Sequence, residues 1–376
     1  MNSPRKFFRA AVALYFITLI PACNCHYADG MGYDFLWPVQ ADLLTSDVSP
    51  SICPSSNQYY FISLFGPRFK RVEYMGGVSY YDFHQGEDIT ANVTIDGHRY
   101  SSDPTNFYPL LCACNGMVDE VIDEDSGEQG RTVRIRCKQK FREFGDDTIY
   151  IKYSHLSEIN PNVTAYSSIT KADTIGFVGA SGNTTLVHLH FSVQRKIGPS
   201  HFDNVHPMRL YRPTDAPHIS TELTDFSVER LPINEGSVVL RFAIPHNQVN
   251  IRYILLVFNS HCGARVSLID FEKISAGYAT RDNPSPVEGL TLFPYRFIRS
   301  KNSYATITEE FDQIPANYPI QIFPITQSGV YNECRYILDI KCHNESLDMA
   351  ARVNFADARI NVMLYDIWGN MIEREL

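Results

Sequence analysis

The stretch YYDFHQGEDIT, residues 80–90, contains two residues of types that bind metals, His84 and Asp88, on either side of Gly86. Glycine weakens a helix, and the aromatic residues before His84 favour extended structure. The stretch therefore predicts that the pair lies at the end of a strand, which runs into a turn and on through Ile89. The spacing leaves two interpretations open: a pair of metal ligands, or a polar turn that happens to contain a histidine. A metal site would need further ligands from elsewhere in the chain.

The composition favours many short strands joined by turns. The 376 residues include 22 Tyr, 23 Phe, 21 Gly and 21 Pro, and the length allows two domains that each bury a core. Apolar and polar residues alternate in stretches such as RTVRIRCKQ (131–139) and TIYIKYSHL (148–156), with turn-forming residues between them. We therefore expect an all-β fold. The best candidate for a short helix is DMAARVNFADA, residues 348–358.

The chain divides at YRPTDAPHIST, residues 211–221, whose two prolines indicate a connection between domains. We place the first domain at residues 30–212, a linker at 213–221 and a second domain at 222–376. Strand patterns in the second domain recur at intervals of about 10 to 25 residues, which is typical of a β-sandwich. We interpret this second domain as a packing or binding module without chemistry of its own.

The N-terminus has the pattern of an export signal. Three basic residues lie before or next to the apolar run AAVALYFITLIPA, residues 10–22, which is too short to span a bilayer comfortably. We expect residues 1–22 to be a signal peptide cleaved near Ala22, with an uncleaved anchor as the alternative. The run ends in LIPAC, which resembles a lipoprotein signal in which Cys23 would carry a lipid. The net charge of −9, without a basic stripe, argues against nucleic acid or anionic lipid as the main partner.

Nine cysteines fit an exported chain in an oxidising compartment. Cys334 and Cys342 flank the strand-like RYILDIK and are candidates for a disulfide. Cys112 and Cys114 project to the same side of a predicted strand, within reach of Cys137. A C-x-C pair with one distant cysteine does not have zinc-knuckle spacing, so we do not expect a structural zinc site here.

Further histidines lie in two other predicted strands. His155 follows a strand-like run in YIKYSHLSE, and His188 and His190 lie in VHLHFSV. Alternation along a strand projects the last two imidazoles to one face, with Leu189 and Phe191 on the other, towards the core. A single histidine after a strand is usually structural, and H-x-H also occurs by chance. The presence of all these groups in one predicted β domain favours a common site.

The chemistry of these residue types suits a catalytic zinc ion, which usually takes three His or Asp/Glu ligands and keeps a fourth position for water. His84, Asp88 and either His188 or His190 would supply that number. Zinc lowers the pKa of bound water from about 15.7 to about 7. The remaining histidines would act as general base and as donor to a developing oxyanion.

Three motifs resemble the lysostaphin/LytM-like zinc endopeptidases, which cut peptide cross-bridges in bacterial cell walls. HQGED at residues 84–88 matches their H-x-G-x-D motif, YSHL at 153–156 matches Y-x-H-L, and HLHF at 188–191 matches H-x-H with its following aromatic residue. The resemblance covers roughly residues 60–195 (about a third of the chain). The chain departs from the family at residues 186–187, where Leu-Val replaces the common Gly-Pro.

The resemblance implies a role for each of the five residues. His84, Asp88 and His190 would bind one Zn²⁺ per chain, and His155 and His188 would be the catalytic pair. It also implies a barrel-like, mostly antiparallel β-sheet in the first domain. The expected activity is hydrolysis of peptide cross-links in peptidoglycan by an exported enzyme of the periplasm or cell envelope. Contact with a membrane is expected only through a lipid on Cys23.

Two alternatives belong to different functional classes. Some LytM-like relatives have lost their zinc ligands and act as non-catalytic activators of cell-wall amidases, but the ligand motifs are intact here. The third interpretation is a surface module that binds carbohydrate or protein and whose histidines are incidental. Zinc content and activity on isolated cell walls would separate these alternatives.

Overall fold

The structure of the protein is a computed structural model. The expected signal peptide, Cys23 and the linker at 213–221 lie outside the described residues. Within the described part, no helix is long and apolar enough to cross a membrane. The described residues are 35–40, 42–43, 58–63, 65–72, 78–95, 98–100, 107–138, 148–184, 186–196, 198, 202–211, 226–234, 236–245, 251–260, 263–272, 290–292, 295–297, 320–326, 335–342 and 353–376.

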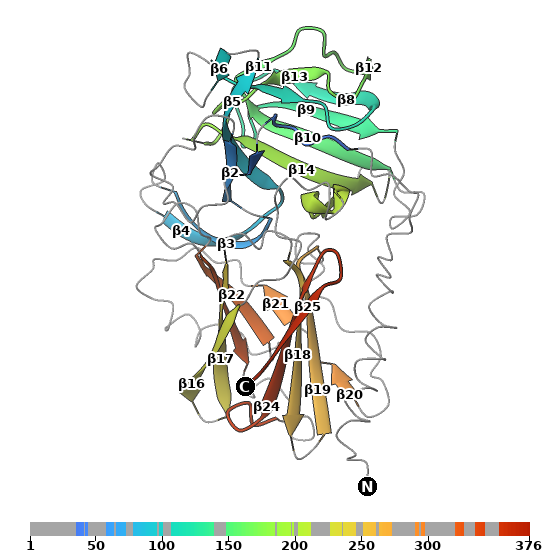
Figure 1. The fold of residues 1–376 in the computed structure, drawn as a ribbon. Helices are drawn as coiled ribbons and strands as arrows, with labels where there is room; N and C mark the ends of the chain where they lie inside the picture. The colour runs from blue at the N-terminus through green and yellow to red at the C-terminus, as the bar shows by residue number, and fades with distance from the viewer. Residues whose placement is uncertain are drawn as a thin grey trace.

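A 10-stranded sheet forms the largest element of the N-terminal half (Figure 1). Its strand order is β1-β2-β5-β14-β10-β9-β8-β12, with β15 also paired to β14 and β6 to β5. The pairings are antiparallel apart from β1 with β2. The strands are β1 (Asp42–Leu43), β2 (Gln58–Ser63), β5 (Glu87–Ile95), β6 (His98–Tyr100), β8 (Gly116–Ile122), β9 (Arg131–Cys137), β10 (Ile149–Leu156), β12 (Ser168–Ile169), β14 (Leu189–Lys196) and β15 (Phe202–Val205).

A smaller sheet of three strands shares its core with the large sheet. It has the order β11 (Glu158–Ile159), β13 (Thr174–Phe177) and β7 (Pro109–Leu111). Leu110 and Ile175 from this sheet join Ile151 and Phe191 from the large sheet in one buried apolar cluster. Alternate residues of the strands enter this cluster, as the sequence pattern predicts.

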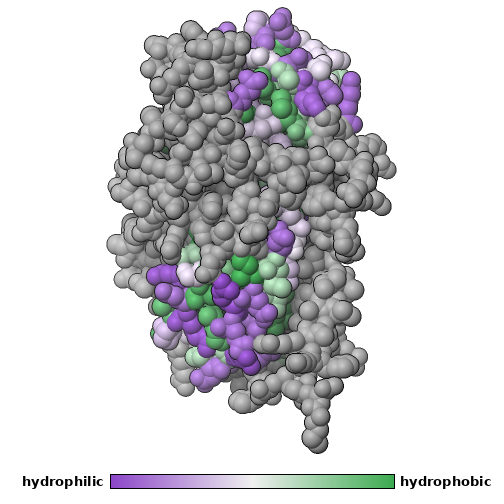
Figure 2. All heavy atoms as spheres, in the orientation of Figure 1, coloured by the Kyte–Doolittle hydropathy of each residue, from purple (hydrophilic) through white to green (hydrophobic). Residues whose placement is uncertain are grey.

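Two sheets of five strands each occupy the C-terminal half, and we call them the C-terminal sheets. They enclose a second apolar cluster that includes Leu240, Phe242, Phe258 and Ile340. In Figure 2, the described surface of this half contains both hydrophilic and hydrophobic residues. One sheet contains, in order, β16 (Ser227–Asn234), β17 (Ser237–Pro245), β23 (Arg335–Cys342), β22 (Ile320–Thr326) and β21 (Tyr295–Phe297); the other contains β20 (Leu290–Leu292), β19 (Gly263–Asp270), β18 (Ile251–Ser260), β24 (Arg359–Asp366) and β25 (Met371–Glu375).

The predicted all-β, mostly antiparallel fold class is confirmed, whereas the domain boundaries stay predictions. The best candidate for a short helix, residues 348–358, forms no helix in its described part, where residues 355–357 form a turn. The Asn354 side chain accepts a hydrogen bond from the Ala356 N–H and donates one to Asp357. Such local side-chain bonds compete with a helix.

A separate hairpin carries the first candidate ligand. Strands β3 (Gly66–Val72) and β4 (Val78–His84) pair antiparallel, with Gly66 opposite His84. Strand β4 ends at His84 and β5 begins at Glu87. The predicted strand that runs into a turn is therefore confirmed, and the structure adds a second strand that contains Asp88.

One of the cysteine expectations is confirmed and one is wrong. Cys114 and Cys137 form a disulfide, while Cys112 and Cys342 are buried free thiols. The expected bridge from Cys342 to Cys334 (which lies outside the described residues) therefore does not form. Cys342 is fully buried in the apolar cluster of the C-terminal sheets, so burial in a core, rather than a covalent bond, accounts for its position.

Removing the Cys114–Cys137 disulfide is expected to destabilise the first half of the protein. The bridge closes a loop over a sequence separation of 23 residues, and a loop of this size predicts a loss of about 3 kcal/mol. Urea unfolding of the Cys114→Ser/Cys137→Ser variant measures this loss. Cys112→Ser is the matched control, because it alters a neighbouring buried thiol and keeps the bridge. Equal midpoints for wild type and the double variant would contradict the prediction.

Candidate metal centre

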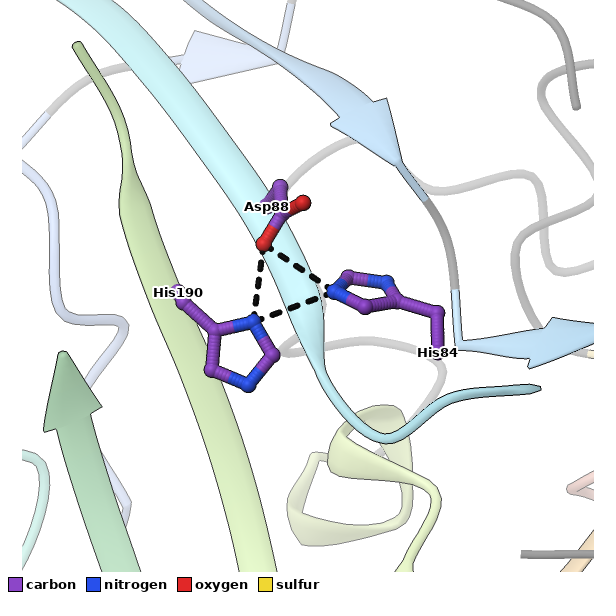
Figure 3. Close-up of side chains that lie close together, drawn as sticks. All are labelled: His84, Asp88 and His190. Atoms are coloured by element: carbon purple, nitrogen blue, oxygen red, sulfur yellow. Dashed lines mark hydrogen bonds and ion pairs between the residues drawn. The ribbon is translucent and has the colours of Figure 1, made fainter. Parts of the chain in front are cut away.

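Strand pairing brings two of the three candidate ligands together. In the antiparallel pair of β5 and β14, Asp88 lies directly opposite His190, and residues opposite each other share a face of the sheet. His84 reaches the same place from the end of β4. Figure 3 shows the three side chains converging from these segments.

The three ligand atoms form a small triangle. Nε2 of His84 lies 3.1 Å from Oδ1 of Asp88 and 3.0 Å from Nδ1 of His190, and the last two atoms are 2.8 Å apart. All three residues are buried. Two donors at about 2.0–2.2 Å from a tetrahedral ion are separated by roughly 3.3 Å, so a small opening of the triangle would fit Zn²⁺. Two imidazole nitrogens and a carboxylate oxygen are also a donor set that zinc accepts.

The electrostatics of Asp88 favour a cation. Burial alone would raise the pKa of this carboxyl, but the nearby His84 and His188 imidazoles and hydrogen bonds from His188 and His190 lower it well below its usual value. Asp88 is therefore a carboxylate at neutral pH, as a metal ligand must be. The His84 ring is also held from behind, because its Nδ1 lies 3.2 Å from the Ser63 hydroxyl oxygen.

The glycine of HQGED is required by close packing. A Cβ atom on Gly86 would lie 2.7 Å from the Phe191 carbonyl oxygen and 2.9 Å from Cε1 and Nε2 of His190. The turn between the first two ligands therefore lies directly against the third. A larger residue would displace either the turn or the His190 imidazole.

His155 occupies an unusual backbone conformation at the edge of the site. Its φ is 65°, a left-handed value that costs a non-glycine residue about 1–3 kcal/mol. It lies where the β9–β10 register shifts between Tyr153 and Leu156. Its Nδ1 donates to the Ser181 carbonyl at 2.8 Å. Burial, followed by the nearby His188 and His190, lowers the pKa of His155 to about 3.

His188 completes the group of five. It forms an isolated bridge to Gly179, and its Nδ1 donates to the Leu186 carbonyl at 2.8 Å. Its Nε2 lies 3.5 Å from Oδ1 of Asp88, and the ring centroids of His188 and His155 are 4.8 Å apart. The structure thus brings all five predicted site residues together, while their roles stay predictions.

The acidic loop that joins β8 to β9 supports His155 indirectly, by holding the segment that contains Ser181. This loop is mostly exposed. Asp125 nevertheless accepts a hydrogen bond from the Gly182 N–H, and the Glu128 carbonyl accepts one from the Asn183 N–H. These bonds hold the segment whose Ser181 carbonyl fixes the His155 ring. Sequence reasoning missed this role because the two loops meet only in the folded chain.

Glu87 is a second feature that the sequence did not reveal. Its side chain is fully buried. Burial raises the pKa of Glu87 well above its usual value, the Phe65 N–H opposes this shift, and the neighbouring Asp88 adds to it. The Phe65 N–H donates to its Oε2 at 3.2 Å, and Nδ1 of His206 lies 4.0 Å from its Oε1. Its place next to a ligand in HQGED was the available signal.

The all-β domain thus brings together a His-Asp-His group that could hold a metal ion, with two further histidines beside it. Residues 96–203 match the model of peptidase family M23, which supports the predicted LytM-like family for this part of the chain. The match contains His155, His188 and His190 but begins after His84 and Asp88. The pairing of β5 with β14 connects Asp88 to the matched segment, and Nε2 of His84 lies 3.0 Å from Nδ1 of His190.

Several solved structures are similar to part of the chain. A catalytic-domain variant of the prophage-encoded M23 protein EnpA from Enterococcus faecalis is 24% identical, covering 34% of this chain and 77% of that one, with a TM-score of 0.25. The lysostaphin catalytic domain from Staphylococcus simulans is 21% identical over 39% and 86%, with a TM-score of 0.27. A zinc-containing peptidase from Vibrio cholerae is 18% identical over 43% and 37%, with a TM-score of 0.26. No curated protein matches the chain.

Gly86→Ala is expected to weaken Zn²⁺ binding at least about tenfold, which corresponds to about 1.4 kcal/mol. The added methyl group would displace the turn or the His190 ring. Calorimetric titration of the metal-free protein with Zn²⁺ measures the affinity. Gly127→Ala is the control, because a Cβ atom there meets nothing within 4 Å, although its φ of 80° also strains alanine. Equal affinities for the two variants would show that the close approach at Gly86 does not shape the site.

Proposed function

We propose that this protein is a zinc metalloendopeptidase that hydrolyses peptide cross-links of bacterial peptidoglycan. The observation that carries the proposal is the convergence of His84, Asp88 and His190 with two further histidines beside them. The peptidase family M23 match supports the reaction class. The substrate follows from the resemblance to the lysostaphin/LytM-like endopeptidases.

The three ligands and the ion would have distinct tasks. Zinc, when bound, would act as a Lewis acid and lower the pKa of a water molecule bound to it from about 15.7 to about 7. Asp88 contributes the negative charge, since its carboxyl group is ionised at neutral pH. His84 and His190 contribute neutral nitrogens, and the Ser63 hydroxyl fixes the His84 ring through its other nitrogen.

His155 and His188 would handle the protons and the developing negative charge. In each ring Nδ1 donates to a backbone carbonyl, so Nε2 is the nitrogen left to exchange a proton. His155 is uncharged at neutral pH because its pKa is lowered to about 3. One of these nitrogens would accept the proton of the attacking water and return it to the leaving amine. Once protonated, Nε2–H would donate to the oxygen of the scissile carbonyl.

The proposed location is outside the cytoplasm, in the periplasm or the cell envelope. The predicted signal peptide at residues 1–22 supports this location. The Cys114–Cys137 disulfide also supports it, because disulfides persist in oxidising compartments. Attachment to a membrane through a lipid on Cys23 is part of the same proposal.

Purified peptidoglycan incubated with the protein is expected to release fragments with newly freed peptide ends, identified by mass spectrometry. His190→Ala removes a ligand, so its digest is expected to match the buffer blank. Chelation of wild-type metal should abolish release, and added Zn²⁺ should restore it. Circular dichroism of His190→Ala confirms that the variant is folded.

Two other results would point to the alternative classes. A zinc-loaded wild type that cuts no peptide but increases the activity of an added amidase would identify an activator. A protein that neither binds zinc nor alters cell walls would identify a binding module. Either result would overturn the proposed peptidase activity.

A further inference from the structure

His84 differs from the other two ligands in what holds it. Asp88 and His190 lie on paired strands of the 10-stranded sheet. His84 is the last residue of β4. Within the described residues, β4 pairs with β3 in a separate two-stranded sheet. The position of His84 therefore depends on the contacts that anchor this hairpin.

The hairpin is anchored by two phenylalanines. Phe65 directly precedes β3 and Phe83 directly precedes His84; both are almost fully buried, with ring centroids 5.1 Å apart in an edge-to-face arrangement. Both belong to the apolar cluster of the C-terminal sheets, together with residues such as Leu240 and Ile320. Strand β3 also lies against β22, and Figure 1 shows the hairpin between the two halves. The side chain next to His84 is thus packed in the second core.

An ionic anchor lies beside this apolar one. Glu272 follows β19, and its carboxylate accepts a hydrogen bond from the His206 N–H at 3.1 Å. It also lies 2.7 Å from Nη1 of Arg209 and 3.3 Å from Nη2 of Arg252. His206 and Arg209 belong to the N-terminal half, at the short 3-10 helix η3 (Pro207–Leu210). The Phe65 ring packs on the His206 imidazole, with centroids 4.8 Å apart.

Phe65 also contacts β5, the strand that carries Asp88, through its backbone N–H. The Phe65 N–H donates to buried Glu87, and Glu87 immediately precedes Asp88. Phe65 therefore joins the base of the hairpin to β5 while its ring lies in the C-terminal core. The three ligands are brought into one triangle by contacts from both halves of the protein.

We propose that the C-terminal sheets are a structural part of the metal site and that Phe83 and Phe65, as positioning residues, place His84 within reach of Asp88 and His190. This inference rests on the proposed function, because it requires a metal bound to all three residues. The coupling is reciprocal: a metal that joins His84 to the large sheet also strengthens the attachment of the C-terminal sheets.

The test uses full-length protein and Co²⁺ alone as a spectroscopic probe of the site. Phe83→Ala is expected to weaken Co²⁺ binding at least tenfold and to reduce the visible absorption per bound ion, because His84 is released from the triangle. Phe83→Leu retains most of the buried volume and is expected to have intermediate affinity. If Phe83→Ala does not fold, Phe83→Leu alone must still bind more weakly than wild type.

Phe258→Ala is the matched control. It removes the same ring from the same apolar cluster, where Phe258 packs on Phe355 with centroids 5.0 Å apart. We expect a comparable loss of stability, but a Co²⁺ affinity within twofold of wild type and an unchanged spectrum. A general loosening of the C-terminal core would instead affect both variants equally.

The outcomes separate this inference from the proposed function. If Phe83→Ala and Phe83→Leu bind Co²⁺ as tightly as wild type does, the inference is overturned. The metal site itself would not be contradicted by this result. Equal weakening in Phe83→Ala and Phe258→Ala would also overturn it. Wild type that binds no Co²⁺ would overturn the metal site, and the inference with it.

Discussion

A single carboxylate oxygen organises the candidate centre. Oδ1 of Asp88 lies 2.8 Å from a nitrogen of His190, 3.1 Å from one of His84 and 3.5 Å from one of His188. A buried carboxylate is costly unless positive charge or hydrogen bonds compensate it. Imidazoles provide part of this compensation, and a divalent cation shared with their lone pairs would provide the rest. The physical demand of this one group therefore favours the metal on which the proposed activity depends.

The position of that oxygen depends in turn on strand register. Asp88 faces His190 because the neighbouring pair, Ile89 and Leu189, is fully buried on the other face of the sheet. Phe191 is also fully buried. A slip of one residue would turn these apolar side chains towards the metal site and the ligands into the core. Ordinary hydrophobic packing thus fixes the alignment of two ligands that are 102 residues apart in sequence.

Local pattern predicted much of this arrangement because strands have a period of two. Alternation correctly placed His188 and His190 on one face, and the aromatic residues before His84 correctly predicted a strand there. Local pattern cannot show long-range packing, however. It gave no sign that Phe83 enters the C-terminal core, and it paired Cys342 with a nearby cysteine although that side chain is buried among apolar residues.

The left-handed backbone of His155 shows a different limit of sequence reasoning. Alternation alone predicts an extended residue at that position. The observed φ of 65° accompanies the bulge between Tyr153 and Leu156, and the Ser181 carbonyl holds the displaced ring. The strain is tolerated because buried neighbours on both sides fix the strand, and it turns the imidazole towards His188. Such a compensation involves several segments and has no signature in any one of them.

The two halves of the sequence do not correspond to two separately packed cores. Phe65 and Phe83 belong to the C-terminal apolar cluster. In the opposite direction, Trp368, in the turn between β24 and β25, belongs to the N-terminal cluster and donates its indole N–H to the Tyr211 carbonyl. Each half therefore contributes residues to the core of the other. Independent movement of the halves would expose apolar surface on both sides at once, and this cost keeps His84 next to ligands that a different part of the chain holds.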